Sequence, residues 1–179
     1  EMDDNFSMLL NQLLPDVAHI GHLNHLSTGL VDVLKNNGIP IVFTLHDFWL
    51  MCPRGQFLTR SIGYANNFQM CAGQENGKCA TNCYAVYFSG IESERQNDID
   101  RWSEWVDVRM QETKSIVSKV DLFIAPSRYL KERFIMDFSV QEDKIIYLDY
   151  GFPTEYLSAS SLPSDRKVFT FGYIGTHIP

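Results

Sequence analysis

The sequence contains no apolar run of the ~18 residues that a membrane-spanning helix requires. It also lacks an excess of positive charge, because its formal net charge is −7. Sequence-independent binding of nucleic acid needs a basic surface, so we expect no nucleic-acid partner and no charge-driven docking on an anionic membrane. The acidic opening, EMDDNF, is not followed by the basic and then apolar segments of a secretory leader. We therefore expect a cytoplasmic protein in a reducing compartment.

Helices and strands are predicted to alternate along most of the chain. The apolar spacing predicts helices over 3–14, 24–37, 99–120 and 128–138, and strands over 17–20, 41–45, 122–126, 144–150 and 168–174. This alternation is typical of an α/β fold, a Rossmann-like parallel sheet with helices on both faces. The unbroken apolar run over 41–45 predicts a strand buried on both faces.

The four cysteines all fall in an irregular insertion at about 52–98, which shows no convincing helical or strand period. They are Cys52, Cys71, Cys79 and Cys83. Thiolates gathered in one loop would suit a tetrahedral structural zinc ion, which would leave no open position for catalysis. No C-x2-C pair is present, so two other interpretations stay open. These are free thiols, or disulfides, which a reducing compartment disfavours.

His46 and Asp47 directly follow the apolar run over 41–45. Ligands of open α/β sheets bind at the carboxyl ends of the strands, so an imidazole and a carboxylate at this place are candidate site residues. A simpler interpretation is that His46 caps the strand end and Asp47 caps a turn.

His19, His22 and His25 form a second candidate cluster with the spacing H-x2-H-x2-H. On a single helix, neighbouring members would share a face and could hold a metal ion. His19 falls in a predicted strand and His22 in a loop, however, so shared ligation is disfavoured. A metal-dependent hydrolase that uses these histidines with Asp47 is therefore the last of our three hypotheses.

Several stretches together resemble one known family. In chain order they are PDVAHIGHLNH (15–25), IPIVFTLHDFW (39–49), VDLFIAPSRYLKERF (120–134), DKIIYLDYGFP (143–153) and FTFGYIGTHIP (169–179). They resemble the N-terminal half of a family-four glycosyltransferase, a retaining, nucleotide-sugar-dependent enzyme of GT-B architecture with two facing Rossmann-like domains. The resemblance covers most of the chain apart from 53–98.

The resemblance implies roles for individual residues. His46 would lie in the cleft between the domains and contact the donor sugar, and His22 would contact the acceptor. Asp47, Arg54, Ser127 and Gly175 are further candidate substrate contacts, although Arg54 also suits an ordinary surface charge. No enzyme nucleophile and no cofactor are required for the chemistry that the resemblance implies.

The resemblance also implies a division of the chain. Residues 1–153 would form the acceptor-side domain, 154–167 a linker, and 168–179 the first strand of a truncated donor-binding domain. The basic residues and Glu-x7-Glu element that hold the donor in the family would lie beyond Pro179. We therefore expect glycosyl transfer by the intact enzyme only, from a nucleotide sugar to a glycan or lipid-linked acceptor, with peripheral membrane contact left open. The rival hypothesis is a non-catalytic α/β binding module whose zinc-stapled loop binds a partner.

Overall fold

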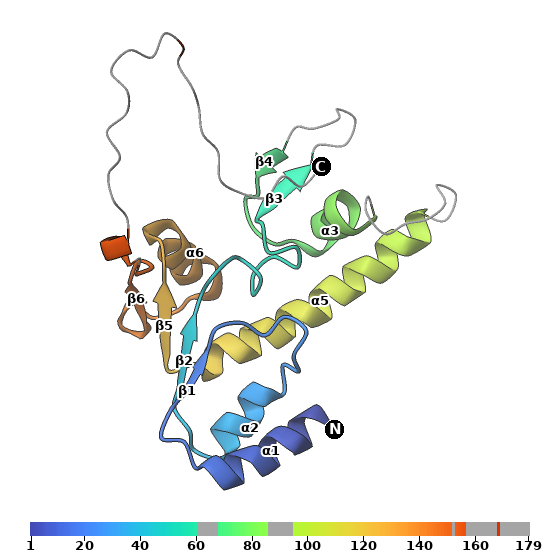
Figure 1. Cartoon of the computed structure of the whole chain (residues 1–179). Coiled ribbons are helices and arrows are strands. Elements are labelled where there is room, and N and C mark those ends of the chain that lie inside the picture. The colour runs from blue at the N-terminus through green and yellow to red at the C-terminus, as the bar shows by residue number, and fades with distance from the viewer. Residues whose placement is uncertain (61–67, 86–94, 152, 157–167, 169–179) are drawn as a thin grey trace.

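A four-stranded parallel sheet forms the centre of the chain in the computed structural model, which describes residues 1–60, 68–85, 95–151, 153–156 and 168 (Figure 1). Its strands are β1 (Ala18–Ile20), β2 (Ile41–Thr44), β5 (Leu122–Ala125) and β6 (Ile145–Tyr147), in the order β1-β2-β5-β6. Helices flank this sheet. The predicted Rossmann-like α/β fold is therefore confirmed.

β2 lies between β1 and β5, with Phe43 opposite Ile20 on one side and Thr44 opposite Ile124 on the other. Ile41 and Phe43 are fully buried, whereas Val42 and Thr44 are half-buried. The sequence predicted a strand buried on both faces. The structure buries one face of β2 completely and the other in part.

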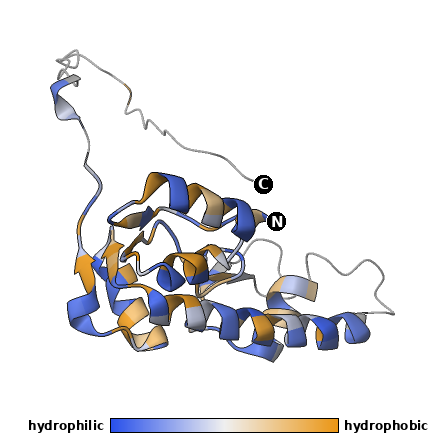
Figure 2. Ribbon diagram, turned by 90° about the horizontal axis from the view of Figure 1, so that it is seen from below, coloured by the Kyte–Doolittle hydropathy of each residue, from blue (hydrophilic) through white to orange (hydrophobic). Residues whose placement is uncertain are grey.

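The principal helices are α1 (Met2–Leu13), α2 (Leu30–Asn36), α5 (Arg95–Lys119) and α6 (Arg128–Phe138). α6 has the predicted bounds, whereas α5 begins four residues before the predicted 99–120 helix and ends one residue before its end. In Figure 2, hydrophobic residues lie between hydrophilic ones along α5, as an amphipathic helix requires. Within the described ranges, every helix is too short or too polar to span a bilayer.

Two predictions about the N-terminal helices were wrong in detail. α2 begins at Leu30 rather than at residue 24, because the chain turns through His25, whose φ of 64° is left-handed. On α1 the apolar spacing predicts an inner face that includes Leu9, Leu10 and Leu13, but only Leu10 is fully buried and the other two are exposed.

The cysteine-containing insertion has more regular structure than the sequence predicted. β3 (Leu58–Arg60) pairs antiparallel with β4 (Phe68–Met70). A short helix α3 (Asn76–Cys79) continues into a π-helical turn, η1 (Ala80–Tyr84). Elements of three to five residues are too short to show a periodic pattern, which is why none was predicted.

The C-terminal part is described only in part. The predicted strand over 144–150 is shorter, because the 3-10 turn η3 (Glu142–Lys144) precedes β6 and the strand ends at Tyr147. A further 3-10 turn, η4 (Thr154–Tyr156), occupies the start of the predicted linker. The remainder of that linker, residues 169–174 of the predicted strand over 168–174, and Gly175 lie outside the described residues.

Candidate functional site at the carboxyl ends of the strands

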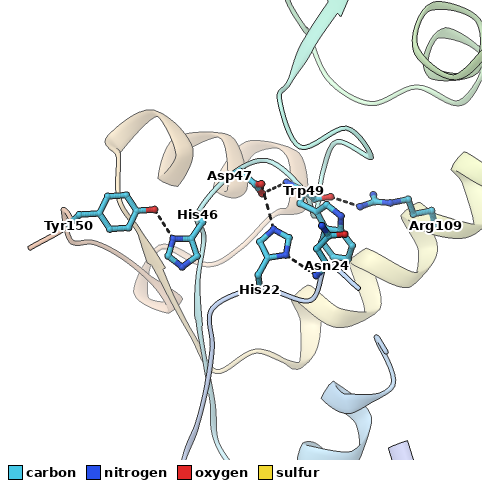
Figure 3. A network of polar contacts seen from close by, with 7 residues as sticks. All are labelled: His22, Asn24, His46, Asp47, Trp49, Arg109 and Tyr150. Atoms are coloured by element: carbon cyan, nitrogen blue, oxygen red, sulfur yellow. Dashed lines mark hydrogen bonds and ion pairs between the residues drawn. The ribbon is translucent and has the colours of Figure 1, made fainter. Parts of the chain in front are cut away.

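Polar side chains from three strand ends meet at one edge of the sheet (Figure 3). Gly21 and His22 follow β1, His46 and Asp47 follow β2, and Tyr150 lies in the loop after β6. Because the strands are parallel, their carboxyl ends share this edge. The structure therefore brings His22, His46 and Asp47 together, as their positions after strands predicted.

His22 and Asp47 form a pair across β1 and β2. Nε2 of His22 lies 3.5 Å from Oδ2 of Asp47. The backbone N–H of Asn24 donates to Nδ1 of the same ring at 2.8 Å, so this nitrogen carries no proton. Nε2 then carries the proton and points it at the carboxylate, which fixes the tautomer of His22.

The loop over 46–55 holds Asp47 in place. Oδ1 of Asp47 accepts from the backbone N–H of Trp49 at 2.8 Å, and Phe48 N–H donates to the carbonyl of Gly55 at 3.1 Å. Gly55 has a φ of +72°, and a Cβ there would lie 3.2 Å from Oδ2 of Asp47. A side chain at position 55 would therefore both strain the backbone and crowd the carboxylate.

Arg109 of α5 anchors the same loop. Its guanidinium lies 4.9 Å from the centre of the Trp49 ring and donates to the carbonyl oxygens of Trp49 and Leu50. Burial lowers the pKa of Arg109, although Tyr84 and nearby cysteines partly offset this effect. Trp49 in turn packs on His22, with ring centres 5.3 Å apart. Figure 3 shows this chain of contacts from α5 to His22.

His46 pairs with Tyr150 on the other side of the site. Nδ1 of His46 and the Tyr150 hydroxyl share a hydrogen bond of 2.7 Å, and the rings lie nearly parallel with centres 5.6 Å apart. Partial burial, and then the charges of Asp47 and Asp149, raise the pKa of Tyr150. The tyrosine hydroxyl is therefore protonated near neutral pH. When this hydroxyl donates to Nδ1, the imidazole proton of the neutral His46 ring is on Nε2.

Nε2 of His46 faces Gly21. A Cβ built on Gly21 would lie 3.6 Å from this nitrogen, so the absence of a side chain there keeps the nitrogen uncovered. Within the described residues no hydrogen-bond partner is recorded for Nε2. This arrangement offers one oriented N–H to an incoming group, next to a carboxylate whose oxygens already have partners. It suits binding and orientation of a polar ligand rather than covalent attack by Asp47.

Comparison of the sequence with models of protein families identifies the family to which this chain belongs. The family model described as Glycosyltransferase Family 4 matches residues 4–156, which include every side chain of the strand-end site. The chain belongs to Glycosyltransferase Family 4. Neither the comparison with curated proteins nor the comparison with solved structures gave a match. The resemblance read from the motifs is thus confirmed at the level of the family.

The other predicted contacts of this Family 4 domain lie in different places. Ser127 caps α6, where its Oγ accepts from the N–H of Leu130 at 3.1 Å. Arg54 donates to the Leu58 carbonyl and lines a cavity among the cysteines, whose lining includes none of the strand-end residues. Gly175 lies outside the described residues. Substrate contact by these residues stays a prediction.

The histidine cluster is not gathered in this Family 4 domain. Nε2 of His19 bonds to Oγ1 of Thr44 at 2.7 Å, and His25 is exposed in the turn before α2. Across the described part of the chain, no group of three or more His, Cys, Asp or Glu side chains stands ready to hold a metal ion.

Two functional candidates could not be recognised in the sequence. Tyr150 was the last residue of the predicted strand over 144–150. In the structure β6 already ends at Tyr147, so Tyr150 lies in the following loop, beside His46. Arg109 lies on the charged side of an amphipathic helix, where the pattern indicates solvent. Nothing in the local sequence distinguishes this arginine, which contacts Trp49, from the solvent-facing charges of the same helix.

Proposed function

We propose that this chain is the acceptor-side domain of an enzyme that transfers a sugar from a nucleotide-sugar donor to a glycan or related acceptor, with retention. Membership of Glycosyltransferase Family 4 supports transfer in general. The observation that carries the finer proposal is the uncovered Nε2 of His46, held by Tyr150 at the sheet edge where ligands of parallel sheets bind.

The chemistry of sugar transfer explains why such a group is useful. The transferred sugar becomes cation-like as its bond to the diphosphate breaks, so its position and hydroxyl contacts must be held tightly. In the proposal, Nε2–H of His46 donates to a sugar hydroxyl of the donor. His22 and Asp47, paired beside it, line the acceptor side.

Retention here uses no nucleophile from this domain. Asp47 is the carboxylate nearest to the site, and its oxygens are engaged by Trp49 N–H and His22. In the proposal the donor diphosphate is held by a second domain, whose first strand is 168–179 and which follows the linker 154–167. Transfer requires no metal ion, and the isolated chain is inactive. We further propose a cytoplasmic enzyme of polysaccharide assembly that contacts a membrane only peripherally.

The first test replaces His46 by alanine in the full-length protein. We expect His46→Ala to lower kcat/KM by about 10²-fold, the size of effect that follows loss of one oriented hydrogen-bond donor in a preorganised site. The measurement is initial-rate transfer from the donor that the wild-type protein uses. The matched control is His25→Asn, because His25 is exposed and asparagine tolerates its positive φ. We expect the control to keep wild-type rates.

A second variant tests the same nitrogen without removing it. Gly21→Ala places a methyl group 3.6 Å from Nε2, an ordinary packing distance, so the domain should fold normally. We expect a raised KM or a lowered kcat, since the methyl covers the nitrogen. Wild-type kinetics in both His46→Ala and Gly21→Ala would remove His46 from the mechanism. Absence of any transfer by the wild-type full-length protein would favour the non-catalytic binding module.

A further inference from the structure

The four cysteines of the chain, which come from three separate segments, line one small cavity. Cys52 comes from the loop that holds Asp47, Cys71 follows β4, and Cys79 and Cys83 lie on α3 and η1. Each carries a free thiol; Cys79 and Cys83 are buried, and Cys52 and Cys71 are half-buried. The free interior of the cavity is about 10 Å³, which is roughly the room that one water-sized body needs.

Backbone contacts bring these segments together without any covalent link. The N–H of Cys71 donates to the carbonyl of Phe57 at 2.9 Å, which ties the end of β4 to the start of β3. Cys79, Cys83 and Tyr84 pack with Val106 of α5 in a small apolar cluster separate from the main core. In the described part of the insertion, little apolar core is therefore available to hold it.

The surroundings of the cavity suit a negatively charged centre. Arg54 and Lys78 both line it, and Arg54 hydrogen-bonds to Cys83. Gln74 also lines the cavity, and both polar atoms of its side-chain amide are buried without a hydrogen-bond partner in the described part of the chain. A buried amide without partners is unfavourable unless another group completes its contacts.

A disulfide bond between Cys79 and Cys83 fits this arrangement less well. Cys79 and Cys83 are four residues apart on consecutive helical turns, where Cβ atoms of such pairs lie about 5–6 Å apart, longer than the about 3.5–4.5 Å of a disulfide. A metal ion between two sulfurs spans that longer separation.

We propose that Cys52, Cys71, Cys79 and Cys83 together bind one structural zinc ion in tetrahedral geometry. The thiols lose their protons to solvent as the Zn–S bonds form, and the product carries a charge of −2, which Arg54 and Lys78 lie close enough to offset. The sulfurs line the cavity but do not form a ready ligand group among the described residues, so the proposal requires the four side chains to turn toward the ion. A site with four cysteine ligands leaves no position for substrate.

The consequence is a clamp between the insertion and the strand-end site. Cys52 is in the same loop as Asp47, and the carbonyl of Cys52 accepts from Gly55 N–H at 2.7 Å. The zinc ion therefore joins β4, α3 and η1 to the loop that positions Asp47. This inference does not depend on the proposed glycosyl transfer, because its test measures metal and thiols.

The wild-type protein, purified without chelator, provides the first measurement. We expect one zinc per chain by elemental analysis. Titration with a mercurial thiol reagent should release this zinc as four thiols react. A chromogenic zinc indicator measures the release. Cobalt substitution should give the intense visible absorption of a tetrahedral tetrathiolate site. Three results would each overturn the proposal. The first is zinc-free protein that also fails to take up zinc or cobalt, and the second is another metal such as iron at full occupancy. The third is a mass 4 Da below that of the reduced chain, which would indicate two disulfides (about 1 Da per hydrogen lost).

Single Cys→Ser variants assign the ligands. Each of the four is expected to weaken zinc affinity at least tenfold, measured by competition with a chelator of known affinity. His25→Asn, as the matched control, should keep wild-type affinity. Variants that fail to fold leave the wild-type titration as the deciding result. Full zinc affinity in any one folded Cys→Ser variant, or its loss in the histidine control, would overturn the four-cysteine assignment.

Discussion

His46 and Asp47 are neighbours in sequence, but their side chains contact different strand ends. His46 reaches Tyr150 after β6, while Asp47, which begins the bend after β2, reaches His22 after β1. Two consecutive residues thus connect three strands at one edge. Substitutions at the two positions should therefore have separable effects, on the uncovered imidazole nitrogen and on the conformation of the loop over 46–55.

Asp121 lies at the opposite edge of the sheet and is expected to contribute to stability. Its Oδ2 accepts from the N–H of the fully buried Ile41 at 2.8 Å, and Lys35 bonds to both of its oxygens. We expect Asp121→Ala to lower the free energy of unfolding by about 2 kcal/mol, because the buried N–H loses its acceptor. Asp121→Asn keeps an acceptor and should lose only about 0.5 kcal/mol. Urea denaturation at pH 7 measures the free energy of unfolding of both variants. Equal losses in Asp121→Ala and Asp121→Asn would contradict the role of the Ile41 N–H bond.

Because of the same carboxylate, we expect the free energy of unfolding to depend on pH. Burial tends to raise the pKa of Asp121, but hydrogen bonds from Ile41 and Lys35, with the charges of Lys35 and Lys144, outweigh it and lower the pKa. Between the folded and unfolded pKa values the unfolded chain binds more protons, so stability rises with pH. The contribution is complete above the unfolded pKa of about 4 and is lost as the pH falls below it. The difference between wild type and Asp121→Asn should therefore shrink below about pH 4.

At the scale of single elements, α6 depends on its first residue. Ser127 has extended backbone and its Oγ accepts from Leu130 N–H, as a helix cap does. We expect Ser127→Ala to lower the free energy of unfolding by about 1 kcal/mol, and Ser127→Asp to restore most of it. Thermal and urea unfolding test both. A serine hydroxyl can also donate, so loss of transfer by Ser127→Ala well below its melting temperature would support the predicted substrate contact.

Elements with both an end signal and a periodic interior could be predicted from the sequence. α6 has the Ser127 cap and apolar residues at Leu130, Phe134 and Phe138, and its bounds agree with the prediction. α2 lacks a side-chain cap, and the Leu26 that extended its apparent pattern is half-exposed in a turn. The apolar period of α1 predicted a helix correctly but not which of its leucines are covered, since covering depends on neighbouring elements.

The candidate site was predictable in position but not in its contacts. The rule that ligands bind at carboxyl ends of parallel strands located His46 and Asp47, and the resemblance to the family pointed to His22. The His22–Asp47 pair depends on the register of β1 against β2, in which Ile20 lies opposite Phe43, and no local pattern specifies that register. The Tyr150 contact likewise depends on where β6 ends.

For the whole molecule, α5 is the element that connects the parts. Its C-terminal half places Ile116 and Val117 in the main core, and Val120, the residue just after the helix, joins them there. Its N-terminal half carries Val106, with Trp102 beside it, into the cluster around Cys79 and Cys83. Arg109 lies between these two regions and holds the loop over 46–55 through Trp49 and Leu50. The cysteine segment and the strand-end site are thus supported by one helix.

Arg109 should therefore influence the site and the global stability together. We expect Arg109→Ala to lower the free energy of unfolding by about 2–3 kcal/mol, because it leaves carbonyl oxygens of a half-buried loop without donors and removes the stacking on Trp49. Arg109→Lys should recover only part of this loss, since an ammonium lacks the planar fork that reaches both carbonyls.

Hydrogen exchange measures the local effect of the same variants. Amide protection at Trp49 and Gly55 should fall in Arg109→Ala, since both amides are bonded within the loop that Arg109 holds. The matched control is Arg101→Ala on the same helix, whose side chain is 68% exposed and pairs with Asp98. It should change stability by less than about 0.5 kcal/mol and leave loop exchange unaltered. Equal effects of the two substitutions, or unchanged exchange at Trp49 and Gly55 in Arg109→Ala, would show that α5 and the site loop are held together by apolar packing alone.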